Sequence, residues 1–246
     1  MQTAAAKRGT DLINAGIQAA HGGRSDEAGT HFLAALDVFA TLPDPAERRG
    51  ELGPAALAFE RMGQHDLALM AVQDALELDQ QLNDHRHFAE DLLTLGNIQM
   101  NLGHAAEAEK TYERVLVVCL THGYLDDAAS ASTNIAILMA NSQRMIQAIE
   151  RLQQSLGYLA TQPHPHTEIN TRLALIQAVD VQSADPALAI DAAKGLFARR
   201  AKELRREEWQ TADAAFRRSV ERYLAADRKL DGAAWKAENF PQLFGG

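Results

Sequence analysis

Apolar residues recur at helical spacing along most of the chain. In the stretch MGQHDLALMAVQDALELD, which begins at Met62, a glycine and a histidine precede a short polar link. An alanine then follows, with apolar residues three and four positions apart. The stretch LGHAAEAEKTYERVLVVC, which begins at Leu102, has the same layout forty residues later. This spacing is typical of amphipathic helices rather than of strands. The two stretches predict a helix–turn–helix unit that is used more than once.

A step of 40 residues brings small residues into register over four repeats. Alanines stand at four anchor positions, and a small residue stands twelve positions before each of them. A large residue follows each anchor by four positions: Phe32, Val72, Tyr112 and Leu152. Antiparallel helices approach closely only where side chains are small. We therefore expect the small residues to form the helix crossings, at Gly16, Ala28, Ala56, Ala68, Gly96, Ala108, Ala136 and Ala148.

The turn of each unit is marked five positions before the anchor. Glycine stands there in three repeats, at 23, 63 and 103, and Gln143 replaces it in the fourth. Glycine at the end of a helix allows positive φ at little energetic cost. In the segment GRSDEA, Ser25 or Asp26 is placed to cap the second helix.

These residues resemble the tetratricopeptide repeat, a helix–turn–helix unit with small residues at the same offsets. The usual period of that family is about 34 residues. The period of 40 is similar to a variant with longer helices, found in kinesin light chains, bacterial peptide-sensing regulators and sensor domains of some transcription activators. The resemblance covers residues 8–161 and lacks the consensus Trp of the first helix. It implies an all-α fold: a right-handed superhelix of antiparallel helix hairpins, a TPR-like α-solenoid with a C-terminal capping helix.

The chain is expected to have three parts. Residues 1–161 hold four repeats, residues 162–206 a degenerate fifth helix pair, and residues 207–246 a capping helix and an apolar tail. The prolines of TQPHPHTE interrupt the array at the first boundary. In the fifth pair, Asp185 is expected to cap the second helix, with Pro186 at its first position. The tail GAAWKAENFPQLFGG carries aromatic residues with no helix to hold them, so it either docks back or binds another molecule.

The resemblance also implies a groove lined by the first helices of the repeats. The residues at the facing offsets are Ile17, His21, Leu57, Arg61, Leu93, Asn97, Asn101, Ile137 and Asn141. Chaperone-binding members of the family clamp a C-terminal carboxylate with lysine and asparagine here. Asn97 fits that pattern but the lysines are missing, which argues against a chaperone adaptor. Apolar patches with amides suit a peptide or helix laid along the groove. Alternatively, several of the Ile and Leu side chains only pack between repeats.

Composition and charge narrow the partners. Of the 246 residues, 46% are hydrophobic, yet no run approaches the roughly 20 apolar residues of a membrane span. The N-terminal segment MQTAAAKRGTDL has no long apolar stretch, so we expect no secretory signal. A single cysteine excludes a disulfide framework and suggests a reducing cytoplasm. Residues 1–193 carry a net charge of −13 and residues 194–246 carry +4, so the body should repel nucleic acid and anionic lipid.

The basic segment ARRAKELRR, residues 198–206, has three interpretations. Its cations could contact phosphates, or pair with the interleaved glutamates of the same helix, or meet an acidic surface such as a second subunit. The acidic body disfavours phosphates.

Candidate catalytic chemistry is sparse. His85 and His87 are two residues apart, so on a helix they point to different sides. His164 and His166 could face one side of an extended link, without a recognised third ligand. Cys119 lies among Val and Leu, as a small buried hydrophobic residue does. The sequence shows no phosphate loop, GxSxG elbow or HExxH motif. We therefore expect no enzyme activity, no metal and no cofactor.

Three hypotheses follow from the sequence. The first is a non-catalytic, cytoplasmic scaffold or adaptor whose groove binds a peptide or helical segment of a partner protein, in assembly or regulation. The second is a ligand-responsive sensor, in which a small molecule or signal peptide in the groove controls an output partner. The third is self-assembly, with the tail of one chain in the groove of the next. None of them involves nucleic acid or a membrane.

Overall fold

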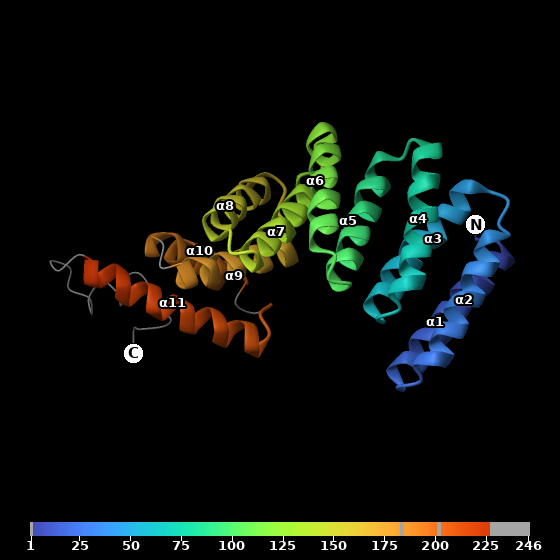
Figure 1. Ribbon diagram of the computed structural model, residues 1–246, viewed down its shortest axis with the longest axis horizontal. Coiled ribbons are helices and arrows are strands. Elements are labelled where there is room, and N and C mark those ends of the chain that lie inside the picture. The colour runs from blue at the N-terminus through green and yellow to red at the C-terminus, as the bar shows by residue number, and fades with distance from the viewer. Residues whose placement is uncertain (1, 183–184, 201–202, 227–246) are drawn as a thin grey trace. The chain divides into compact units, whose positions relative to one another are not determined.

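The computed structural model describes residues 2–182, 185–200 and 203–226, without the side chains of residues 199 and 200. Over these residues the chain forms eleven α-helices and no strand (Figure 1). The all-α prediction is therefore confirmed. The helices are α1 (Ala4–His21), α2 (Ser25–Ala40), α3 (Pro45–Arg61), α4 (His65–Leu82), α5 (His85–Asn101), α6 (Ala105–His122), α7 (Leu125–Asn141), α8 (Met145–Thr161), α9 (Pro165–Gln182), α10 (Pro186–Arg200) and α11 (Arg206–Ala226).

The helix starts follow the forty-residue period. The odd-numbered helices from α3 to α9 begin at residues 45, 85, 125 and 165. The even-numbered helices from α2 to α10 begin at residues 25, 65, 105, 145 and 186. The last helix begins at residue 206, about one period after α9. Helix α11 therefore takes the place of the first helix of a further repeat.

The chain divides into two compact units, residues 1–127 and 128–246. In the first unit, α1 pairs with α2, α3 with α4 and α5 with α6, each as an antiparallel hairpin (Figure 1). In the second unit, α9 pairs with α10, and α11 packs on both. The ring of Phe197 in α10 lies 5.8 Å from that of Phe216 in α11 and 6.0 Å from that of Trp209. The last helix thus covers the apolar edge of α10.

All eight residues predicted at helix crossings are buried. A Cβ atom at Gly16 would lie 2.3 Å from Cε1 of Phe32, and one at Gly96 would lie 2.4 Å from Cε1 of Tyr112. The glycine and the aromatic ring hold equivalent positions in repeats one and three. In these two repeats the aromatic residue after the anchor therefore fills the space that a missing side chain leaves on the first helix.

The turns have the backbone that the glycines predict. Gly23, Gly63 and Gly103 have φ of 74°, 72° and 79°, and Gln143 has φ of 61° at the same place. The predicted cap at Ser25 or Asp26 is wrong, because both residues already lie within α2 and Arg24 precedes the helix. The turn between α1 and α2 is short, so Arg24 occupies the capping position, and its side chain makes no capping hydrogen bond. Ser25 Oγ instead accepts a hydrogen bond from Gln64 Nε2 at 3.1 Å.

The start of α10 agrees with the sequence. Helix α10 begins at Pro186, and Asp185 Oδ1 accepts a hydrogen bond from the backbone N–H of Ala187 at 2.9 Å. The apolar tail lies outside the described residues, as do the side chains of residues 199–202. The predictions that rest on them stay predictions.

Candidate binding site on the first helices

None of the nine predicted groove residues is buried. The four that precede the anchors by seven positions are exposed: His21, Arg61, Asn101 and Asn141. The other five are half-buried, with one part of the side chain packed and one part open to solvent. This exposure leaves the groove assignment a prediction, and it leaves the Ile and Leu residues able both to pack and to contact a ligand.

Two of the predicted amides are held by neighbouring side chains. Asn101 Nδ2 in α5 donates to Glu60 Oε1 in α3 at 2.7 Å, which links the first helices of consecutive repeats. The hydroxyl of Tyr112 donates to Asn97 Oδ1 at 2.7 Å. Tyr112 is fully buried and is the same residue that fills the space above Gly96. The core of the hairpin thus orients the Asn97 amide.

A pocket of about 440 Å³ lies between the first helices α3 and α5, and we call it the α3–α5 pocket. It combines an apolar end, which includes the predicted groove residue Leu57, with a charged end. Glycines on α3 leave part of its wall without side chains. Its lining residues are Ala46, Arg49, Gly50, Gly53, Pro54, Leu57, Leu82, Asp84, His87, Glu90, Asp91 and Thr94.

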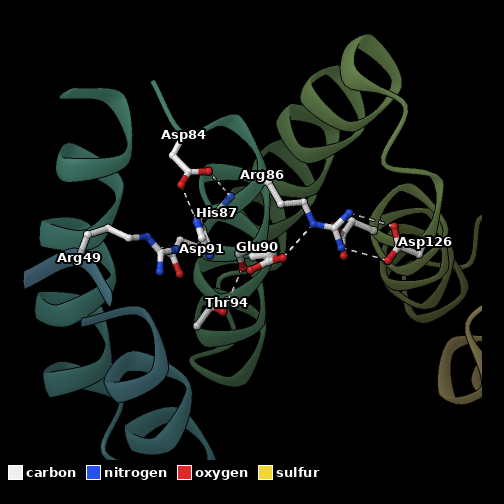
Figure 2. Close-up of polar contacts among 9 residues, drawn as sticks. Arg49, Asp84, Arg86, His87, Glu90, Asp91, Thr94 and Asp126 are labelled. Carbon is white, nitrogen blue, oxygen red and sulfur yellow. Dashed lines mark hydrogen bonds and ion pairs between the residues drawn. The ribbon is translucent and has the colours of Figure 1, made fainter. Parts of the chain in front are cut away.

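A buried arginine stands at the charged end of this pocket. Arg49 Nε donates to Asp79 Oδ1 at 2.6 Å, and Arg49 NH2 donates to Asp91 Oδ2 at 2.9 Å. The three side chains come from α3, α4 and α5, and they are 8%, 0% and 5% exposed. Figure 2 shows the Arg49 side chain extending toward Asp91. The triad ties three consecutive helices together through charge.

The two aspartates of the triad share a single guanidinium. Burial raises the pKa of Asp91 to about 7; the charge of Arg49 opposes this shift and Asp79 adds to it. The second carboxylate oxygen of Asp79, Oδ2, is buried and accepts no hydrogen bond within the described part of the chain. Near neutral pH Asp91 therefore holds a proton for part of the time, because burial disfavours its ionised form.

A second charged network adjoins the pocket, which Asp84, His87 and Glu90 line. Asp84 Oδ2 lies 2.6 Å from His87 Nδ1, and this contact is the main cause that lowers the pKa of Asp84. Arg86 Nε donates to Glu90 Oε1 at 2.9 Å, while Arg86 NH2 lies 3.1 Å from Asp126 Oδ2 (Figure 2). Arg86 NH2 also lies 3.2 Å from Asp127, whose pKa burial raises to about 6. This network therefore holds more carboxylates than cations.

Two further pockets carry different chemistry. In the second unit, a pocket of about 220 Å³ lies against α7, α8 and α9, and its lining includes the predicted groove residues Ile137 and Asn141 together with Gln177 and Val181. In the first unit, a pocket of about 700 Å³ on α5 and α6 is lined by apolar residues with a charged rim, among them Phe88, Leu92 and Val117. The sequence did not indicate this last pocket.

The charged residues of the α3–α5 pocket were not predicted. The sequence pattern does not distinguish Arg49, Asp79 and Asp91 from the ordinary polar positions of amphipathic helices. One signal was available: Arg86 and Asp126 stand one forty-residue period apart and bond to each other. A search for opposite charges at equivalent positions of consecutive repeats would have found this pair.

The histidines take separate partners. His85 stacks on His122, with 4.3 Å between ring centroids, while His87 bonds to Asp84. His164 Nδ1 accepts from the backbone N–H of Thr167 at 3.3 Å, at the start of α9. Nδ1 of His166 lies 3.3 Å from Asn170 Nδ2. Over the residues that the structure describes, no group of three or more His, Cys, Asp or Glu side chains could hold a metal ion.

Two other predicted features are placed by the structure. Cys119 is buried, and burial raises the pKa of its thiol to about 12, so it is a protonated, packed side chain. The basic segment does not form one helix, because α10 ends at Arg200 and α11 begins at Arg206. Arg205, just before α11, donates from Nε to Glu208 Oε1 at 2.8 Å, so it pairs with a glutamate but not within one helix. No helix among the described residues has the length and apolar character needed to cross a membrane.

Comparisons with known proteins identify the repeat. The tetratricopeptide repeat profile matches residues 92–116, and no curated protein matches the sequence. Aspartyl phosphate phosphatase F from Bacillus subtilis is 10% identical with a TM-score of 0.72, and the alignment covers 95% of this chain and 66% of that one.

Two further structures share the fold. The Rap conjugation gene regulator of the plasmid pLS20, in complex with the Phr* peptide, is 13% identical with a TM-score of 0.63, over 93% of this chain and 62% of that one. A putative kinesin light chain from Podosopora anserina is 16% identical with a TM-score of 0.55, over 81% and 99%. This chain thus spans just under two thirds of the first two structures. The chain carries a tetratricopeptide repeat and has the helical-solenoid fold of tetratricopeptide-repeat proteins, which confirms the resemblance seen in its sequence.

Proposed function

We propose that this chain is a non-catalytic scaffold that binds a peptide segment of a partner protein along the exposed side of its first helices. The observation that carries the proposal is the α3–α5 pocket, which places an apolar end at Leu57 beside hydrogen-bonding side chains. Peptides need both features, because apolar contacts supply affinity and polar groups orient the backbone. A regulator with the same fold is in complex with the Phr* peptide, which supports a peptide as the ligand class.

The non-catalytic part of the proposal rests on the chemistry of the described residues. The thiol of Cys119 is buried and its pKa is raised, so it cannot serve as a thiolate nucleophile. The ion pairs around the α3–α5 pocket hold one helix to the next, as a structural network does. One protein of similar fold is named a phosphatase, so the absence of catalysis is tested with two phosphatase substrates, acetyl phosphate and p-nitrophenyl phosphate. We expect no turnover of either.

The binding part is tested with peptides selected from a phage library of random dodecapeptides and then synthesised. Leu57→Arg places a charge in the apolar end of the pocket, and we expect it to weaken the selected peptides at least tenfold. Met70→Arg is the matched control, because Met70 is 52% exposed on the second helix α4. If both variants bind every peptide with equal affinity, the peptide site does not lie on the first helices. A library that yields no binder would refute the proposal.

A sensor is the second candidate, favoured by the same peptide-bound regulator. In that case the peptide alone would alter the binding of a further partner. A peptide that raises the melting temperature and also changes capture of a cellular protein supports the sensor. A peptide that merely competes with that protein for one site supports the scaffold.

A further inference from the structure

The lining of the α3–α5 pocket carries an excess of negative charge. It holds three carboxylates, those of Asp84, Glu90 and Asp91, beside one guanidinium, that of Arg49. Arg49 is divided between Asp91 and Asp79, and Glu90 shares Arg86 with Asp126 and Asp127 outside the lining. A carboxylate that shares its cation gains less from it, so the potential at the pocket favours a further positive charge.

Arg49 also directs an unused hydrogen-bond donor into the pocket. Its side chain is 8% exposed, and its Nε and NH2 atoms are engaged by the aspartates. Its third nitrogen, NH1, takes part in neither bond, is open to solvent, and lies 2.9 Å from where a Cβ of Gly53 would be. A charged donor that bonds to water can exchange that water for a carbonyl oxygen of a ligand.

The α3 wall admits a peptide backbone to this donor. A Cβ at Gly50 would meet no atom within 4 Å, so space stands open beside the helix there. Gly53 lines the pocket next to Arg49, and its lack of a side chain keeps NH1 uncovered. A backbone carbonyl can therefore approach Arg49 where a side chain on α3 would exclude it.

We propose that the α3–α5 pocket selects a positively charged nitrogen of the bound peptide, held by Glu90 and its neighbouring carboxylates, while Arg49 NH1 donates to an adjacent backbone carbonyl. The cation is a lysine or arginine side chain or an N-terminal ammonium, which share this chemistry. The inference rests on the proposed function and names the class of peptide that the site takes. The other charged or titratable groups of the lining are Asp84, His87 and Asp91. Asp79 from α4 contacts Arg49, and Arg86 from α5 contacts Glu90, both from outside the lining.

Binding of such a cation is coupled to a proton. A positive charge in the pocket favours the ionised form of Asp91, and without a ligand burial holds its pKa at about 7. The affinity should therefore rise several-fold from pH 6 to pH 8 as the bound proton is lost. Asp91→Asn removes the titrating carboxyl, so the affinity of that variant should be much less dependent on pH over this interval.

The test uses the dodecapeptides selected against the full chain, which display free N-termini. We expect the selected sequences to be enriched in lysine or arginine. Replacement of the basic residue by norleucine or citrulline should weaken binding at least tenfold, measured by fluorescence anisotropy. If acetylation of the N-terminus has that effect instead, the ammonium is the bound cation. Binders that tolerate both changes would overturn the inference and leave the proposed function standing, whereas a library without binders would overturn both.

A pair of charge-matched variants separates local recognition from general attraction. Glu90→Gln keeps the size of a side chain that is 42% exposed and removes its charge, and we expect about a tenfold loss of affinity for the basic peptides. Glu107→Gln makes the same charge change at an exposed position of α6 outside the pocket lining, and should stay within twofold of the unaltered chain. Equal losses in both variants would contradict a specific pocket. Far-UV circular dichroism verifies that each variant is folded.

Discussion

Arg49 and Asp91 connect the first helices of consecutive repeats, with Arg49 NH2 2.9 Å from Asp91 Oδ2. Burial raises the pKa of Asp91 to about 7, and the neighbouring Asp79, which shares the guanidinium, adds to this shift. In the unfolded chain the same carboxyl titrates near its ordinary value of 3.8. The difference makes the stability of the first unit depend on pH.

The first prediction concerns that dependence. A carboxyl whose pKa is raised by folding stabilises the native state when protonated, so its contribution is fully present below about pH 4 and is lost as pH rises to 7. Between about pH 4 and pH 7 this carboxyl should lower the free energy of unfolding by an amount on the order of 2–4 kcal/mol, and Asp91→Asn should abolish that decrease. Asparagine retains an acceptor for Arg49 and adds a donor for Asp79. Urea denaturation at pH 5, 6, 7 and 8 measures the effect.

The control for this prediction is Asp37→Asn on the exposed side of α2. It should leave the pH profile of the urea midpoint unchanged. The raised pKa of Asp127, about 6, acts in the same direction and remains in both variants, so some slope persists below pH 6. If the urea midpoint of Asp91→Asn depends on pH in the same way as that of the unaltered chain, this aspartate does not titrate between pH 5 and 8.

The second prediction concerns the contact between Gly96 and Tyr112. A methyl group at Gly96 would lie 2.4 Å from the ring, so Gly96→Ala should destabilise the chain by about 1–3 kcal/mol through overpacking. Gly50→Ala is the control, because no atom lies within 4 Å of its Cβ position. There the greater helix propensity of alanine should stabilise by about 0.5–1 kcal/mol. Calorimetric melting temperatures that shift in the same direction for both would contradict the close crossing.

The period of this chain is visible in the sequence for a local reason. A hairpin needs a small residue where its helices cross and positive φ where it turns, and both requirements repeat with the hairpin. Gly96 and Gly103 satisfy them within eight residues of each other. The period of the helices could therefore be predicted closely. The capping residue of α2 could not, because the sequence does not distinguish a turn that ends at Arg24 from a turn that ends one residue later, at Ser25.

The charged end of the pocket was not predictable in the same way. Asp79 lies near the end of a second helix and resembles a solvent-exposed acid, yet it is buried. Its burial depends on how α3, α4 and α5 are rotated about their axes. The apolar pattern shows which face of each helix is buried, but it does not define the rotation closely enough to place one polar residue at the edge of that face. Leu57 could be assigned to the first-helix face because its offset repeats, whereas Arg49 has no equivalent arginine in the other repeats.

The third prediction concerns a buried cluster of hydroxyl groups in the second unit. Thr171 Oγ1 donates to the carbonyl oxygen of Thr167 at 2.7 Å and lies 2.7 Å from Thr133 Oγ1. Ser155 Oγ lies 3.3 Å from Thr171 Oγ1. Thr171→Val keeps the shape of the side chain but removes its hydrogen bond to Thr167 and its contacts with the hydroxyl groups of Thr133 and Ser155, so we expect a loss of about 0.5–1.5 kcal/mol in the free energy of unfolding.

The apolar triple variant separates pairing from shape in this cluster. Thr133→Val, Ser155→Ala and Thr171→Val together remove every hydroxyl, so their combined loss should be smaller than the sum of the three single losses. Thr211→Val, at an exposed position of α11, should change stability by less than about 0.5 kcal/mol. Additive losses in urea denaturation would show that the hydroxyl groups act independently.

The fourth prediction concerns Gln143, which has φ of 61° where the first three repeats carry glycine. A side chain in the left-handed region is strained, and this turn has no glycine to relieve it. Gln143→Gly should therefore raise the free energy of unfolding by about 0.5–1 kcal/mol, after the greater flexibility of glycine in the unfolded chain is subtracted. The reverse change, Gly103→Gln, places the same side chain at φ of 79° with no atom within 4 Å of its Cβ position, so it should destabilise through the backbone alone. Opposite signs for the two variants in thermal melting support a shared turn geometry, whereas a loss in both would mean that the Gln143 side chain makes a stabilising contact that outweighs the strain.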